Sequence, residues 1–211
     1  MKQLKRLILI LVISLSFTGV AKAQFYEIAN QIPQLLSPAL SGNFNYKGYV
    51  EVSYLKGVGS DIFDFVDFST TQGFKYRNWF FMGVGAGVDV MIPSTDFSLY
   101  KQDASVMVSL YADFRFLIGN QSKVSVNLDV RMGAAFVFDN FHTNNGYLLE
   151  DENFYLRPTL SVRFPINKDR PKQAISVGFS YQLLLNAWEN GHYFDEAKDF
   201  HNVGATIGFE W

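Results

Sequence analysis

The C-terminal nine residues alternate strictly between two kinds of side chain. Every second residue is apolar, and the residues between them are small or polar. The apolar set is Val203, Ala205, Ile207, Phe209 and Trp211, and the other set is Gly204, Thr206, Gly208 and Glu210. Because side chains on a strand point to opposite faces with a period of two, this pattern predicts a strand with one apolar face and one glycine-rich polar face.

Seven further segments show the same alternation, so the sequence predicts eight strands. They lie at about 46–56, 63–75, 79–91, 105–117, 123–137, 154–164 and 174–184, followed by 203–211. Pro158 falls within the sixth segment, where a proline must lose a ladder hydrogen bond or occupy a bulge. After the first 23 residues, no apolar stretch approaches the roughly 18 residues of a spanning helix.

The links between these segments alternate in length. Short turns are predicted near 77–78, 119–122 and 167–172, and longer links at 57–62, 92–104, 138–153 and 185–200. The Asn-Gly pairs at 145–146 and 190–191 are typical of hairpin tips. An even strand number with short turns at one rim predicts an all-β fold: a closed antiparallel eight-stranded up-and-down transmembrane β-barrel, with short periplasmic turns and longer extracellular loops.

Alternation alone does not say which face is inside, and a soluble lipocalin-like barrel would bury its apolar face. Here the apolar face holds almost no charge in the middle of any strand, whereas the other face carries Gly, Ser, Asp and Arg and lacks Lys. Aromatic residues gather at the short-turn ends of the strands, as in an interfacial girdle: Phe74, Tyr76, Trp79, Phe80, Phe116, Phe164 and Trp211. These features favour lipid outside and charge inside.

The inward face is expected to hold a charge network. Its members would be Glu51, Asp67, Asp89, Asp113, Arg115, Asp129, Arg131 and Arg157. An eight-stranded barrel is just wide enough for its own side chains, and a buried charge must be paired. The lumen is therefore predicted to be filled and structural, with a proton or ion path as the alternative. Gly83, Gly85 and Gly87 would make room for Phe81, Tyr111 or arginine side chains rather than form a dinucleotide loop, since no helix follows them.

The N-terminal residues have the order of a secretory signal peptide. Lys2, Lys5 and Arg6 precede an apolar run, and the small residues Ala21 and Ala23 then precede Gln24. The expected organisation is a signal peptide at 1–23, a periplasmic arm or short helix at 24–44 and the barrel at 45–211, with an uncleaved anchor as the alternative. With no cysteine in the chain, neither a lipid-attachment cysteine nor a disulfide is expected.

No catalytic, cofactor-binding or metal-binding residue is assigned, and an enzyme is not expected. His142, His192 and His201 fall in or beside long links without ligand spacing, and no G-x-S-x-G motif is present. The net charge of −2 gives no electrostatic case for nucleic acid. The links at 138–153 and 185–200 mix acids with aromatics, which suits either an extracellular ligand surface or simple packing within tall hairpins.

Several segments resemble the small outer-membrane β-barrel proteins that are widespread in Bacteroidetes, over nearly all of the chain after the signal peptide. They are Leu36–Gly42 before Tyr46–Glu51, Ser69–Gly73, the glycine-rich third strand, Leu156–Phe164 and Ile207–Trp211. The resemblance implies an integral outer-membrane protein of a Gram-negative bacterium, in contact with outer-membrane lipid, with a structural or surface-interaction role. Such proteins more often end in Phe than in Trp.

The final strand would present Ile207, Phe209 and Trp211 as a signal to the barrel-assembly machinery. The resemblance supplies no catalytic residue or cofactor. Three other roles stay open from the sequence: a barrel-embedded hydrolase, a narrow channel and a soluble lipocalin-like carrier.

Overall fold

The structure, a computed structural model, describes residues 44–59, 63–77, 79–93, 104–120, 123–138, 141–142, 148–149, 152–167, 170–186 and 199–211. Within these ranges no helix has the length and apolar character needed to cross a membrane. The predicted signal peptide with Ala21, Ala23 and Gln24, and the predicted arm up to residue 43, lie outside the described residues.

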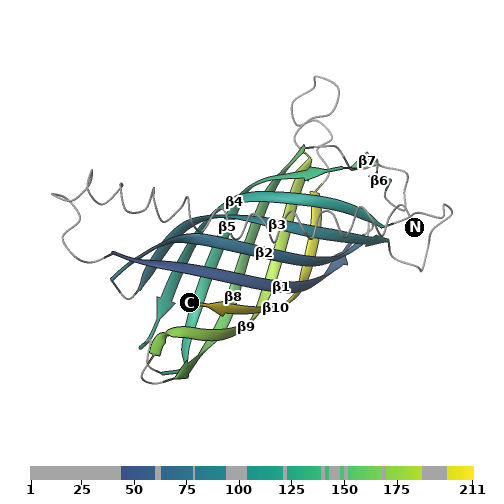
Figure 1. Cartoon of the computed structure of the whole chain (residues 1–211). Coiled ribbons are helices and arrows are strands. Elements are labelled where there is room, and N and C mark those ends of the chain that lie inside the picture. The colour runs from purple at the N-terminus through teal and green to yellow at the C-terminus, as the bar shows by residue number, and fades with distance from the viewer. Residues whose placement is uncertain are drawn as a thin grey trace, which may run out of the picture. The chain divides into compact units, whose positions relative to one another are not determined.

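Eight strands form one closed antiparallel barrel (Figure 1). They are β1 (Phe44–Val58), β2 (Phe63–Tyr76), β3 (Phe80–Pro93), β4 (Ser105–Ile118), β5 (Ser125–Val137), β8 (Glu152–Asn167), β9 (Arg170–Asn186) and β10 (Asp199–Glu210). Two short strands, β6 (Phe141–His142) and β7 (Leu148–Leu149), pair with each other in the link between β5 and β8. The predicted fold class and all eight predicted strands are confirmed, and most strands extend beyond their predicted ends.

The barrel closes where the first strand meets the last. Figure 1 shows β1, in blue, beside β10, in yellow, and the register pairs Tyr49 with Glu210. Just beyond β10, the backbone N–H of Trp211 donates to the carbonyl of Gly48 at 3.1 Å, and the N–H of Gly48 donates back at 3.3 Å. A Cβ on Gly48 would lie 2.3 Å from Cζ2 of the Trp211 indole. Glycine is therefore needed here for the indole to pack across the seam.

The register fixes the width of the barrel. Paired residues can be followed from strand to strand around the barrel, starting at Leu55 on β1. After all the other strands have been crossed, the path returns to β1 at Asn45, ten residues from its start. With usual strand spacing and rise, this stagger implies a strand tilt of roughly 40° and a backbone diameter of roughly 16 Å. A lumen of this width is filled by side chains.

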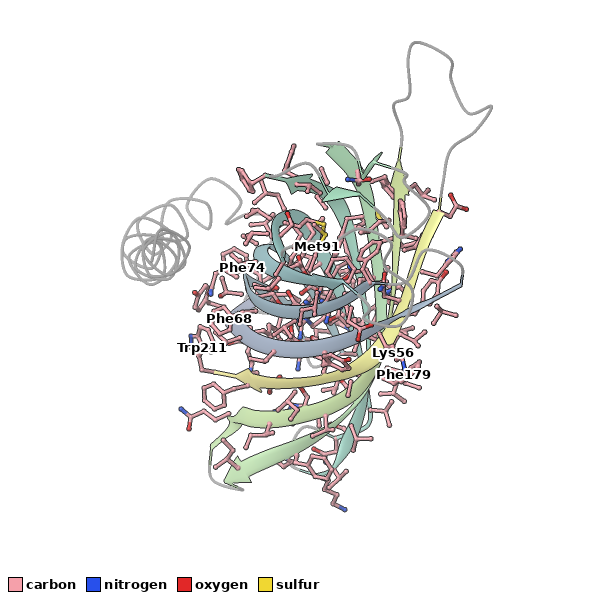
Figure 2. The ribbon with its side chains drawn as sticks, turned by 90° about the vertical axis from the view of Figure 1, so that its right-hand side faces the viewer. Lys56, Phe68, Phe74, Met91, Phe179 and Trp211 are labelled. Carbon is pink, nitrogen blue, oxygen red and sulfur yellow. The ribbon has the colours of Figure 1, made fainter. Side chains whose placement is uncertain are left out.

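The apolar faces of the strands point outward. The outward side chains of Val52, Val84, Leu160, Val177, Phe179 and Ile207 are 47–61% exposed, whereas Asp113 and Arg131 are completely buried. Leu128 is also exposed and Val108 half-buried. Figure 2 shows Phe68, Phe74 and Trp211 outside the ribbon and Met91 inside it. This sidedness is the reverse of a soluble barrel, in which the apolar residues face inward.

Pro158 disturbs the sheet on one side only. On the β5 side, pairing continues through Val130 and Pro158. On the β9 side, pairs exist for Leu156 and Thr159, but none is formed by Arg157 or Pro158. The expected loss of ladder bonds at this proline is confirmed, since proline has no N–H to donate.

Candidate functional site: the barrel lumen

The middle of the lumen is occupied by an ionic cluster around Glu51. Arg115 donates to Glu51 from Nη2 at 2.8 Å, and the guanidinium of Arg131 binds the same carboxylate. Arg115 also pairs with Asp113 at 2.6 Å, and Arg131 with Asp129 at 3.0 Å. All five side chains are buried. Strands β1, β4 and β5 supply them, so these ion pairs connect strands that are not all neighbours in the sheet.

A second ion pair lies nearer the long-loop ends of the strands. Nη1 of Arg157, on β8, donates to Oδ1 of Asp67, on β2, at 2.7 Å. The other terminal nitrogen, Nη2, contacts the hydroxyls of Ser53 and Thr206. Thr206 in turn bonds to Ser180 at 2.5 Å. Because β2 and β8 are opposite in the closed strand order, this pair spans the lumen.

Aromatic rings pack against the arginines inside the barrel. The guanidinium carbon of Arg115 lies 3.7 Å from the ring centre of Tyr49, and that of Arg131 lies 5.2 Å from the centre of Tyr111. Such contacts stabilise a desolvated cation. A Cβ on Gly85 would lie 2.4 Å from Cε2 of Tyr111, so this glycine makes room for the ring, as expected.

Two inward lysines correct the sequence analysis. Lys47 and Lys75 face the lumen near the short-turn ends of β1 and β2, with exposures of only 3% and 4%. Lys47 pairs with Glu210 at 3.1 Å, and Arg163 binds the same carboxylate. The expectation that the inward face lacks lysine is therefore wrong. Strand parity gives the correct assignment, because Lys47 lies four residues before Glu51 on the same face.

The long-loop end of the lumen is apolar. A buried cluster, here named the apolar cap, consists of Leu55, Phe63, Phe65, Met91, Met107, Tyr111, Ala135, Val137, Tyr155, Leu184 and Phe200. Most of these residues lie within a few positions of a strand end. The sequence predicts that paired charges fill the lumen and does not predict this cap. Most apolar inward residues thus lie on the long-loop side of the charged ones, and Tyr111 joins the two groups through its contact with Arg131.

Asp89 differs from the other residues assigned to the network. Seven of the eight, Glu51, Asp67, Asp113, Arg115, Asp129, Arg131 and Arg157, bind one another. Asp89 also points inward with no exposure, but neither of its carboxylate oxygens has a hydrogen-bond partner. Its neighbour in register on β2 is Asp67, another acid.

The histidines assemble no catalytic or metal site within the described residues. His201 faces outward, and its Nδ1 lies 2.6 Å from the hydroxyl of Tyr181, also on the outer face. His142 is in β6, with an undescribed side chain, and His192 lies outside the described residues. Where side chains are described, no three His, Cys, Asp or Glu residues are grouped to hold a metal. Residues 187–198, most of the link at 185–200, also fall outside.

A closed eight-stranded barrel with an apolar exterior and an ionic interior has the fold of small outer-membrane β-barrel proteins. No protein-family model and no curated protein matches the sequence. Among solved structures, Neisserial surface protein A (NspA) is similar with a TM-score of 0.54 and 14% identity, over 79% of this chain and 97% of that one. The outer membrane enzyme PagL is similar with a TM-score of 0.49 and 12% identity, over 77% and 97% of the two chains.

The ionic cluster predicts strong coupling between Glu51 and Arg131. Removing Arg131 leaves three buried carboxylates with one arginine, so Arg131→Gln is expected to lower the free energy of unfolding by about 3 kcal/mol. Glu51→Gln leaves each arginine with an aspartate, so it should lower the free energy of unfolding by only about 2 kcal/mol through its lost charged hydrogen bonds. The double variant should lose less than the sum of the two, because it removes one charge of each sign from the cluster. Urea unfolding in detergent, followed by tryptophan fluorescence, measures these values.

Lys56→Gln is the matched control, since Lys56 is exposed on the outer face of the same strand as Glu51. Its effect should stay within about 0.5 kcal/mol. Strictly additive losses for Glu51 and Arg131 would contradict a coupled network.

Proposed function

We propose that this chain is an integral outer-membrane protein whose barrel is closed to solutes and whose long loops act at the cell surface, in a structural or surface-interaction role. The observation that carries the proposal is the sidedness of the barrel. Large apolar side chains cover the outer face, while arginines and acids are buried at its axis. An outer face of this kind is stable in hydrocarbon and would be poorly soluble in water.

The aromatic residues at the short-turn rim support a membrane location. Trp79, Phe80 and Phe116 form a cluster with ring centres 5.2–6.3 Å apart. At the same rim, Phe209 on β10 and Trp211 just beyond it stack with ring centres 6.1 Å apart. Aromatic girdles of this kind lie at the membrane interface. In the proposed orientation this rim faces the periplasm, and the long links face outward.

The lumen supports a role for the loops rather than for transport. The ionic cluster blocks the middle of the barrel, and the apolar cap fills its long-loop end. A solute would have to displace both. The links at 138–153 and 185–200 are therefore the proposed contact surfaces for an extracellular ligand, and β6 pairing with β7 gives the first of them a hairpin.

The proposal includes the path to the membrane. The signal peptide would be cleaved after Ala23, and the assembly machinery would bind the last strand through Ile207, Phe209 and Trp211. The exposure of Ile207 and Phe209 on the outer face, 59% and 39%, leaves both accessible to such a partner. On the sequence resemblance, the proposed source is a bacterium of the Bacteroidetes.

Cell fractionation combined with a gel-mobility assay tests the membrane location. The protein is expected in the outer-membrane fraction, and unboiled samples should migrate differently from boiled ones, because the closed barrel resists detergent until heated. Recovery in the aqueous periplasm without a mobility shift would exclude the proposal and favour a soluble carrier.

Two arginine substitutions test whether lipid covers the outer face. Val84, near the middle of β3, is 61% exposed, and Ile118, at the end of β4, is 64% exposed. In a bilayer, Val84→Arg should lower the free energy of unfolding by about 2–4 kcal/mol, whereas Ile118→Arg near the interface should lower it by about 0–1 kcal/mol. Reversible folding into phospholipid vesicles, followed by tryptophan fluorescence, measures both. Small and equal costs would indicate that water covers this face.

Planar-bilayer recording tests the closed lumen. The refolded protein is expected to give no stepwise conductance, since charged and apolar side chains fill successive levels of the barrel. A porin recorded in the same bilayers serves as the positive control. Reproducible single-channel steps from mobility-shifted protein would establish the narrow-channel alternative instead.

A further inference from the structure

One level of the lumen holds buried polar atoms that form no hydrogen bond. It lies between the Arg157–Asp67 ion pair and the apolar cap, and we name it the polar layer. Its unpartnered atoms are both carboxylate oxygens of Asp89, the hydroxyl of Ser109, both amide atoms of Gln182 and the amide oxygen of Asn202. These side chains are at most 1% exposed. A buried polar atom without a hydrogen-bond partner lowers the stability of the folded state. A ligand bound in this layer would therefore stabilise the protein.

The polar layer has two facing sides. Asp89 is on β3 and Gln182 on β9, which are opposite in the closed strand order. Both side chains are buried and enter the lumen from opposite walls. Asn202, beside Gln182 in the register, donates from Nδ2 to the carbonyl of Phe63 at 2.9 Å. Its amide oxygen is the atom left without a donor.

On the other side, oxygens converge over a glycine. A Cβ on Gly87 would lie 2.6 Å from Oγ of Ser109 and 3.1 Å from Oδ2 of Asp67. Gly87 precedes Asp89 by two residues on the same inward face of β3. The missing side chain at Gly87 thus lets two oxygens from neighbouring strands approach each other next to Asp89.

The charges of this level do not balance. Arg157 neutralises Asp67 at 2.7 Å, while Arg131 is engaged by Glu51 and Asp129. No ion pair joins Asp89 to any of the residues the structure describes. An ionised carboxylate with no exposure and no partner would cost several kcal/mol. An ionised Asp89 would therefore need one positive charge beside it.

We propose that the polar layer binds one monovalent metal cation, directly or through water, with Asp89 as its principal ligand. The oxygens of Asp67 and Ser109 would complete the near side, and the amide oxygens of Gln182 and Asn202 the far side. Carboxylate, hydroxyl and amide oxygens are the ligands that hard cations prefer. A single unbalanced charge selects a monovalent ion. A proton on Asp89 would add one donor to those of the Ser109 hydroxyl and the Gln182 amide; the salt comparison below distinguishes it from a metal cation, because a proton gives no sodium effect.

The surroundings make this a structural ion rather than a permeating one. The apolar cap covers the layer on the long-loop side, and the paired side chains of the ionic cluster fill the lumen on the short-turn side. Exchange of the bound cation with cations in solution is therefore slow, and the cation is taken up as the barrel folds. The inference rests on the lumen alone, so failure of the proposed surface role would leave it intact.

The test compares unfolding in two salts. Protein is refolded from urea in sodium chloride or in choline chloride at equal ionic strength, because choline is too large for the layer. The wild-type protein should lose its gel-mobility shift at a temperature about 3 °C higher in sodium, as for any ligand bound only by the folded state. Asp89→Asn should show no difference between the salts, and in choline it should be at least as stable as the wild type.

Asp64→Asn is the matched control, since Asp64 is on the outer face of β2, where it accepts a hydrogen bond from Tyr54 at 2.5 Å. This variant should keep the salt difference. Equal transitions of the wild type in both salts would overturn the inference, and so would a sodium effect that persists in Asp89→Asn.

A second measurement needs no variant. Crystals of the wild-type protein refolded in rubidium chloride should give an anomalous difference peak within coordination distance of the Asp89 carboxylate. A map without a peak in the lumen at that level would overturn the inference even if Asp89→Asn fails to fold.

Discussion

Each barrel strand is hydrogen-bonded to a neighbour on both sides, and the rest of the structure depends on this closure. A closed ladder has no free edge, so the backbone is satisfied without water and the outer face is free to be apolar. Closure with a ten-residue stagger also fixes the diameter. The lumen then has a set volume, which inward side chains must fill and whose charges they must neutralise.

The filling is graded along the barrel axis. Lys47, Lys75, Arg163 and Glu210 lie at the short-turn end, the cluster around Glu51 in the middle, and the apolar cap at the long-loop end. Each level connects strands that are remote in sequence, as Arg157 and Asp67 do from opposite walls. The interior therefore fixes the register of the whole sheet, in addition to the backbone bonds between adjacent strands.

The sequence predicted strand number, sidedness and most inward residues, because a period of two is a local property. It did not predict which arginine meets which acid, since Arg131 reaches Glu51 across strands whose relative heights depend on the stagger. It missed the apolar cap because Phe63 and Phe65 put apolar side chains on the face that carries Asp67, so the usual polarity of the inward face reverses there. Lys47 and Lys75 were overlooked although the same period of two places them with Glu51 and Asp67.

The seam between β1 and β10 has a consequence for how the chain reaches its final state. Tyr49 and Glu210 are among the partners most distant in sequence, yet they complete the cylinder. Any folding intermediate that lacks the last strand has two unpaired strand edges, one of them on β1. Such a species has unpaired backbone N–H and C=O groups along both strand edges and would be unstable in the hydrocarbon of a bilayer. In the proposed membrane setting, insertion would then be nearly concerted, with a companion protein or the lipid surface shielding those edges until the final residues arrive.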